Sequence, residues 1–159
     1  MKTSITTAVA IISLTIVGVV FAQGGMGMGM GPQGGMGMMS GSSVRHHFVM
    51  QNGIDPEYAG ATNPLSGTAE SVAHGRQIYE QNCATCHGPQ GFGDGPAGKS
   101  LQPPPANLVN LSRMPMVSDG YLYWTVAEGG VPVGSSMPPF KDVLKSDDIW
   151  AVILYLQTL

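Results

Sequence analysis

The stretch NCATCHGPQGFGDGPAGKS, residues 82–100, contains both cysteines of this 159-residue chain and fits three unrelated patterns. Residues 93–98 fit the dinucleotide-binding pattern G-x-G-x-x-G, and residues 93–100 fit the phosphate-binding loop G-x-x-x-x-G-K-[ST]. Both patterns need a preceding strand and a following helix whose N-terminus faces the phosphates. The prolines at 103–105 prevent that helix, and no β-α-β unit surrounds the glycines. We therefore interpret both glycine patterns as coincidental and expect no nucleotide ligand.

The third pattern, Cys83-Ala84-Thr85-Cys86-His87, is the C-x-x-C-H sequence through which haem c is attached. On a helical turn the two thiols can add to the two haem vinyl groups as thioethers, and the adjacent histidine can donate a ring nitrogen to iron. A redox dithiol would instead need a β-α-β context, and a zinc site would need two further ligands. The motif predicts one covalent haem c bound by Cys83, Cys86 and His87.

The second axial ligand of haem iron decides whether a haem protein is suited to electron transfer or to catalysis. Met137 lies on a proline-stiffened loop, residues 134–140, ahead of the last predicted helix, and is our predicted iron ligand. Met114 and Met116 flank Pro115 in a similar loop and are the second choice. The alternative role for any one methionine is core filling. The remaining candidates, for which packing or surface roles are expected, are Met50, His46, His47 and His74.

Three segments have helical patterns, and no segment alternates with the period of a strand. Thr68 can cap a helix that runs to about Gln81, and Ser118 with Asp119 can open a helix over 121–128. The last helix is predicted from 146 to about 157, with a wide apolar face. Three short helices joined by long loops bury a poor core, which a large apolar cofactor would complete. The predicted fold is all-α.

The first 22 residues have the pattern of a secretory signal. Lys2 precedes an apolar run, and small residues favour cleavage after Ala22, although an uncleaved anchor is the alternative. Without residues 1–22, the chain has six Lys and Arg residues and ten Asp and Glu residues, so it lacks the basic surface that nucleic acid needs. The sequence therefore predicts an exported, periplasmic protein with no nucleic-acid partner.

The predicted organisation continues with a flexible Met/Gly-rich tether over 23–43, because glycine at that density cannot hold a helix or strand. Its thioethers could alternatively bind Cu(I), which prefers soft sulfur ligands. Residues 44–67 are predicted to be an ordered N-terminal extension laid on the domain, and residues 68–159 to be the haem domain.

Over residues 68–159 the sequence resembles class I c-type cytochromes. The features that carry this resemblance are Gly75 and Tyr79 before the C-x-x-C-H motif, the glycine- and proline-rich loops, Met137-Pro138, and Trp150 with Tyr155 on a terminal helix. It implies a small cytochrome c-like domain with one covalent haem between His87 and Met137. It also implies that Gly75 lets the first helix cross closely over the last, and that a carbonyl of residues 103–105 accepts the His87 N–H.

These observations together predict an electron carrier and not an enzyme. Its iron would cycle between Fe(II) and Fe(III) as it exchanges electrons with redox-protein partners. Because charged residues are only 11% of the chain, docking is expected to use an apolar patch. The alternatives are a haem peroxidase in which Met137 is displaced and a copper-binding protein that uses the tether. The chain could also be a bound subunit of a dehydrogenase, reductase or oxidase, including one associated with a membrane.

Overall fold

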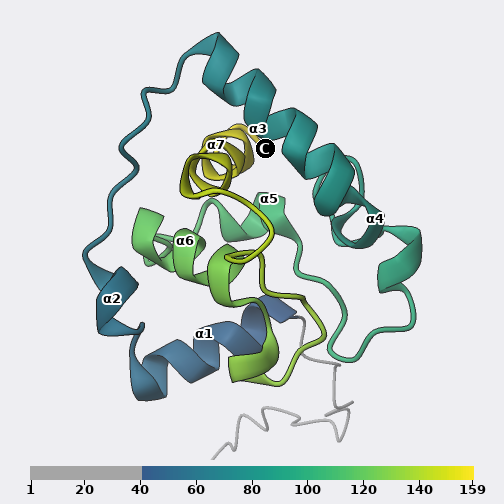
Figure 1. Ribbon diagram of the computed structural model, residues 1–159. Coiled ribbons are helices and arrows are strands. Elements are labelled where there is room, and N and C mark those ends of the chain that lie inside the picture. The colour runs from purple at the N-terminus through teal and green to yellow at the C-terminus, as the bar shows by residue number, and fades with distance from the viewer. Residues whose placement is uncertain (1–40) are drawn as a thin grey trace, which may run out of the picture. The chain divides into compact units, whose positions relative to one another are not determined.

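A computed structural model describes residues 41–159, so the predicted signal and the tether up to residue 40 lie outside the described residues. The described part contains seven α-helices, two 3-10 helices and no strand (Figure 1), which confirms the predicted all-α class. The helices are α1 (Gly41–Asn52), α2 (Pro56–Ala59), α3 (Ala69–Asn82), α4 (Ala84–His87), η1 (Pro96–Gly98), α5 (Leu108–Leu111), α6 (Asp119–Glu128), η2 (Val131–Val133) and α7 (Ser146–Leu156).

The capping residues define where the helices begin, as the sequence predicted. The Thr68 side chain accepts the backbone N–H of Ser71 at the start of α3. The Ser118 side chain accepts the backbone N–H of Tyr121, so α6 begins at Asp119, two residues before the predicted start. Each cap satisfies a backbone donor that the first helical turn leaves without an intrahelical partner.

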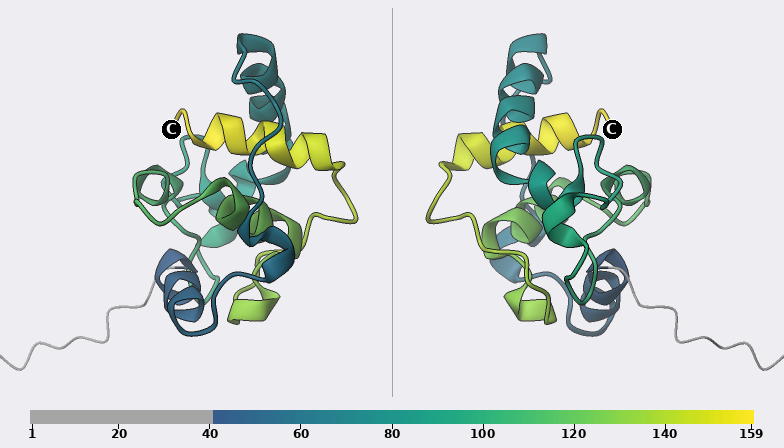
Figure 2. Two further views of the ribbon diagram at one scale, coloured as in Figure 1. Left: turned by 90° about the vertical axis from the view of Figure 1, so that its left-hand side faces the viewer. Right: turned by 90° about the vertical axis from the view of Figure 1, so that its right-hand side faces the viewer.

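The long helices α3 and α7 cross in direct contact (Figure 2). At the crossing, Gly75 is buried, and a Cβ atom there would lie 1.9 Å from the carbonyl oxygen of Ala151. Only a residue without a side chain lets the two backbones approach so closely. The close crossing that the resemblance implied for Gly75 is confirmed.

Two groups of buried side chains form the core beneath this crossing. The smaller group joins α3 to α7, and the larger group joins α6 and α7 to the loops. Their members are Ile78, Tyr79, Val152 and Leu156 in the smaller group, and Leu111, Tyr121, Leu122, Val126, Ala127, Phe140, Ile149, Trp150 and Ile153 in the larger. Several of these side chains also line a cavity, so the core encloses a space that apolar side chains surround.

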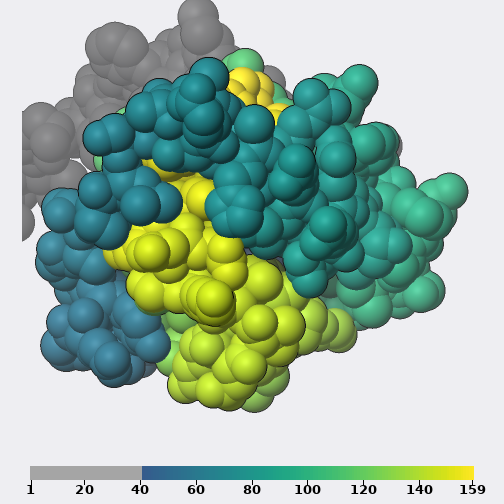
Figure 3. Space-filling model, turned by 45° about the horizontal axis from the view of Figure 1, so that its top comes forward, coloured from purple at the N-terminus to yellow at the C-terminus, as the bar shows by residue number. Residues whose placement is uncertain are grey.

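Residues 44–67, the predicted extension, lie against the domain. Phe48 stacks on Trp124 of α6, with ring centroids 6.0 Å apart. The Asn63 amide donates to the backbone oxygen of Trp150 in α7, and Figure 3 shows this blue segment and the teal α3 on either side of the yellow α7. Helix α1 includes residues 41–43, which were predicted as the end of the tether, and the Gly41 N–H donates to the Pro104 oxygen at 2.8 Å.

A hydrogen bond from Tyr58 ties α2 to the end of α6. The Tyr58 hydroxyl donates to Glu128 at 2.6 Å, and Lys141 also donates to this carboxylate. These hydrogen bonds, first that of Tyr58 and then that of Lys141, lower the pKa of Glu128 below its ordinary 4.5. A carboxyl group whose pKa is lowered by folding stabilises the fold at pH values above its unfolded-state pKa. That stability is lost as the pH falls through its folded-state pKa.

We therefore expect Tyr58→Phe to lower the free energy of unfolding by about 1 kcal/mol at neutral pH. Urea titrations over a range of pH should show the difference from the parent protein shrinking as the pH falls below 4.5. Tyr123→Phe is the matched control, because the Tyr123 hydroxyl donates to the neutral Ser146 hydroxyl. If the difference in unfolding free energy between Tyr58→Phe and the parent stays constant down to the lowest pH measured, the Tyr58 hydroxyl does not stabilise the fold through the Glu128 carboxylate.

Candidate functional site

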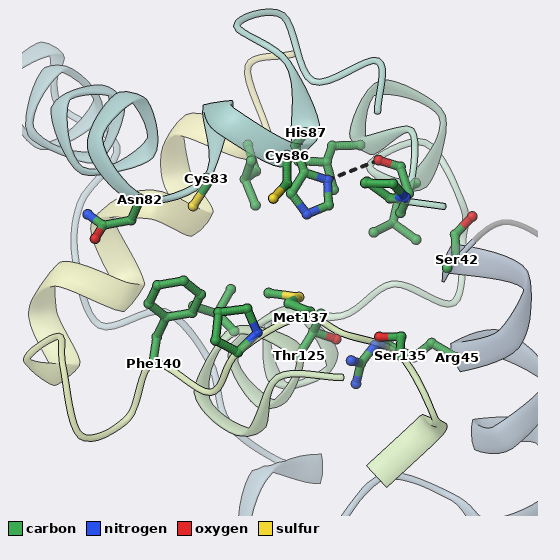
Figure 4. Close-up of a pocket in the computed structure, with 18 of the residues that line it drawn as sticks. Ser42, Arg45, Asn82, Cys83, Cys86, His87, Thr125, Ser135, Met137 and Phe140 are labelled. Carbon is green, nitrogen blue, oxygen red and sulfur yellow. Dashed lines mark hydrogen bonds between the residues drawn. The ribbon is translucent and has the colours of Figure 1, made fainter. Parts of the chain in front are cut away.

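A cavity of about 260 Å³ lies inside the domain, between the turn that follows α3 and the loop that precedes α7. Its walls are mainly apolar and come from α1, α3, α4, α5, α6, α7 and the connecting loops. Cys83, Cys86, His87 and Met137 all line it, so the structure brings the four sequence-predicted site residues to one cavity (Figure 4).

The Cys-His turn is a single helical turn, α4, that continues from the end of α3. The backbone N–H groups of Cys86 and His87 both donate to the Cys83 oxygen, and the Cys83 N–H donates to Tyr79 in α3. This geometry directs the side chains of the motif to one side of the backbone, and Figure 4 shows both sulfur atoms and the imidazole at the upper wall of the cavity.

The glycine-rich run that resembles a phosphate loop packs against this turn. The Gly93 N–H donates to the His87 oxygen at 2.8 Å, and the Gly95 N–H donates to the Cys86 oxygen at 3.1 Å. A Cβ atom at Gly95 would lie 2.5 Å from the Thr85 oxygen, so glycine is needed for the close approach. These amides are occupied within the chain and are not directed at an anion, which agrees with our rejection of the two nucleotide patterns.

The His87 ring is fixed by the carbonyl of Ala106, which accepts from Nδ1 at 3.0 Å. The carbonyl can only accept, so Nδ1 carries the proton, and Figure 4 shows the other ring nitrogen directed into the cavity. Burial lowers the pKa of His87, and the bond to Ala106 opposes this effect in part. The buried site therefore favours a neutral imidazole with a free lone pair on Nε2, which is the form that binds metal.

The predicted acceptor for His87, a carbonyl of residues 103–105, is wrong by one residue. The Pro104 oxygen instead accepts the N–H of Gly41. The Pro105 oxygen faces Gly93, where a Cβ atom would lie 2.7 Å away. The carbonyls of the proline run are thus directed at other backbone, and the next carbonyl along the chain reaches the imidazole.

Cys83 and Cys86 form no disulfide with each other and are half-buried at the edge of the cavity. Burial, with a smaller effect of the neighbouring Cys86, raises the pKa of the Cys83 thiol to about 12. A thiol held neutral in this way is a poor redox nucleophile and a poor zinc ligand, both of which require the thiolate. Within residues 41–159, no three His, Cys, Asp or Glu side chains gather as a metal site.

Met137 lies on the wall opposite His87 (Figure 4). Its loop is held by backbone contacts that the sequence analysis did not foresee. The Gly130 N–H donates to the Met137 oxygen at 2.8 Å, and a Cβ atom at Gly129, which has φ of +65°, would lie 2.6 Å from the same oxygen. Gly129 and Gly130, which directly follow α6, thus hold the methionine loop. The Phe140 N–H fixes its far end by donating to the backbone oxygens of Val126 and Ala127 in α6.

The other candidate ligands do not line the cavity. Met114 and Met116 are exposed, as is Met50 on α1. His74 is exposed on α3 and contacts Asp148 of α7 at 2.8 Å. On α1, Arg45 lines the cavity together with Gly41 and Ser42, and neither neighbouring histidine does. The sequence pattern gave Arg45 no role, because only the contact of α1 with Trp124 shows which helix face is buried.

The residues present fit haem c in the chemistry of their donors and in their surroundings. An imidazole nitrogen faces a thioether across the cavity, two thiols lie beside the imidazole, and most of the remaining wall is apolar. A flat apolar macrocycle would meet these walls and complete the core described above. One guanidinium nitrogen of Arg45 is also buried at the cavity and has no hydrogen-bond partner in the part of the chain that the structure describes.

The all-α fold and this cavity define a c-type cytochrome domain. Comparison with known families supports this, since residues 70–156 match the family described as cytochrome c oxidase, cbb3-type, subunit III. Because the match covers more than half of the chain, the chain belongs to that family. The class implies covalently bound haem c and a role in electron transfer.

Among solved structures, the chain is similar to the Kuenenia stuttgartiensis reducing HAO-like protein complex Kustc0457/Kustc0458. The identity is 26% and the TM-score 0.51, over 60% of this chain and 46% of that one. This chain therefore corresponds to less than half of its structural relative. No curated protein sequence matches this chain. None of the helices within residues 41–159 has the length and hydrophobicity that crossing a membrane would require.

Proposed function

We propose that this protein is an exported carrier of single electrons with one haem c. Cys83 and Cys86 hold the haem covalently, and His87 and Met137 are the two axial ligands of its iron. When bound, haem c supplies an iron that gains and loses one electron. The observation that carries the proposal is the position of the His87 ring nitrogen and the Met137 side chain on opposite walls of one apolar cavity.

The chain's own residues would keep these ligands in place in both redox states. Ala106 fixes the orientation and tautomer of the His87 ring. The backbone bonds at Gly130 and Phe140 hold the Met137 loop against α6. Two ligands held by rigid backbone leave little to rearrange when an electron arrives, and they block access of small molecules to iron. A thioether ligand in an apolar site also favours the reduced form.

The partners are proposed to be redox proteins, in a soluble exchange or inside a larger complex. The family description refers to a subunit of a cytochrome c oxidase, and the structural relative is a two-protein redox complex. Export is supported by the predicted signal over residues 1–22 and by the attachment of haem c outside the cytoplasm.

A redox titration followed by absorbance tests the carrier function. We expect one reversible one-electron transition and no significant turnover of hydrogen peroxide, because both axial positions are filled. A ferric protein that binds peroxide rapidly and turns over would contradict the carrier and support the alternative of a peroxidase in which Met137 is displaced.

Docking is expected to depend weakly on salt, because few charges are available to steer a partner. The second-order rate of electron transfer to a small redox protein should change by less than about threefold from low to high ionic strength. A basic and an acidic redox protein should be compared in the same experiment. A steep loss of rate with salt for either one would indicate docking through charge.

A further inference from the structure

Arg45 on α1 is a buried charge with an incomplete set of partners. Its side chain is 4% exposed and lies over the Trp124 ring, with Cζ 4.7 Å from the ring centroid. One guanidinium nitrogen, Nη2, donates to the Gly129 oxygen. The other, Nη1, is buried and has no hydrogen-bond partner within residues 41–159.

Such a group is costly to leave unpaired. A buried donor without an acceptor loses its hydration, and the loss is larger for a charged donor. Within residues 41–159, no carboxylate forms an ion pair with Arg45. Loss of hydration on burial lowers the pKa of the guanidinium. The ionisable group that acts on it electrostatically is the Tyr121 hydroxyl, which is also buried and itself has a raised pKa.

The position of Arg45 shows where the missing partner would lie. The side chain lines the same cavity as His87 and Met137, and Figure 4 shows its guanidinium at the lower wall beside Ser135 and Met137. Among the described residues that line the cavity there is no Asp or Glu, so the chain itself offers this cation no anionic partner there. The missing partner is therefore an anion that enters the cavity.

We propose that Arg45 Nη1 binds a propionate carboxylate of the haem, an inference that rests on the proposed function. The haem macrocycle is apolar except for its iron and its two propionates, and a guanidinium matches a carboxylate in both charge and geometry. The Gly129 oxygen and the Trp124 ring hold the guanidinium so that Nη1 remains available.

This assignment makes the N-terminal extension part of the cofactor site. Arg45 lies outside residues 70–156, the part of the chain that matches the family. Helix α1 would therefore add an anion-binding group to a site whose predicted haem-binding residues all lie in the family-matched part of the chain. The positive charge would balance a propionate close to iron and so favour the ferrous state.

The wild-type protein loaded with haem gives the direct test. A crystal structure should show a propionate oxygen within hydrogen-bonding distance of Arg45 Nη1. Both propionates lying elsewhere, with water or another group on Nη1, would overturn the inference. This experiment needs no substitution and so does not depend on whether a variant folds.

Substitutions give the functional test through the reduction potential. Arg45→Gln should lower the ratio of ferrous to ferric protein at a fixed applied potential by roughly tenfold, which is 59 mV for one electron. Arg45→Met should give a similar loss, whereas Arg45→Lys should restore most of the parent value because it retains the charge. Arg76→Gln, which removes an exposed arginine of α3, is the control and should leave the potential unchanged.

The same samples separate the two proposals. One outcome overturns the role of Arg45 alone. In that outcome every sample is coloured and carries the mass of haem, but the reduction potential is the same with arginine, lysine or glutamine at position 45. Protein that is colourless at the bare-chain mass overturns the proposed function and, with it, this inference. Denaturant unfolding of each variant shows whether loss of the Gly129 contact has weakened the fold independently of the potential.

Discussion

Gly75→Ala is expected to lower the free energy of unfolding by about 3 kcal/mol or more, or to prevent folding altogether. A methyl group at this position would lie 1.9 Å from the Ala151 oxygen and 2.4 Å from its carbonyl carbon. Both atoms are backbone and cannot rotate away, so α3 and α7 would have to separate. In an unconstrained helix the same change would stabilise by about 1 kcal/mol, so the expected sign is opposite to that of intrinsic propensity.

Urea denaturation followed by circular dichroism measures this effect. The matched control is Gln77→Ala, because Gln77 is exposed on the same helix and its replacement should leave stability nearly unchanged or slightly higher. If the Gly75 variant were as stable as its parent, the close approach of the two helices would not be a requirement of the fold.

Met137→Ala is expected to have the largest effect on the redox properties. Loss of the thioether ligand should abolish the sulfur-to-iron absorption band and open one axial position to added ligands such as carbon monoxide. The midpoint potential should fall by on the order of 100 mV, since axial ligands tune haem over about 0.8 V. Peroxide should then react faster than with the parent protein.

Two other methionines provide the controls for this experiment. Met114 and Met116 are exposed and do not line the cavity, so their alanine variants should keep the absorption band and the potential. Loss of the band in either variant, together with its survival in Met137→Ala, would assign the ligand to the loop around Pro115. The spectra of the three variants therefore distinguish the sequence-predicted ligand from its second choice.

The main helices were predictable because their ends carry local signals. Thr68 and Ser118 cap α3 and α6 as expected, and the apolar face of the last helix set its extent to within a residue or two. Helix α1 had no such signal, since its sequence GSSVRHHFVMQN contains neither a capping box nor a clear apolar stripe. Contacts far along the chain hold it, namely Phe48 on Trp124 and Gly41 on Pro104.

In the candidate site, too, the sequence could predict the residues that local patterns mark, but not those whose position depends on contacts far along the chain. The C-x-x-C-H motif and the Met137-Pro138 pair could be recognised because their meaning depends on adjacent residues. The acceptor of the His87 N–H could not be placed to the residue, because it depends on which way each carbonyl of a proline run faces. Arg45 could not be assigned at all, since its burial follows from how α1 packs on α6.

The mass and absorption spectrum of the exported protein, produced with an intact haem-maturation system, test the central claim most directly. We predict a chain heavier by one haem, with a haem spectrum that survives denaturation because Cys83 and Cys86 hold it covalently. The Cys83→Ala, Cys86→Ala double variant should lose both the added mass and the retained spectrum. A wild-type protein that is colourless and has the mass of the bare polypeptide would contradict the account.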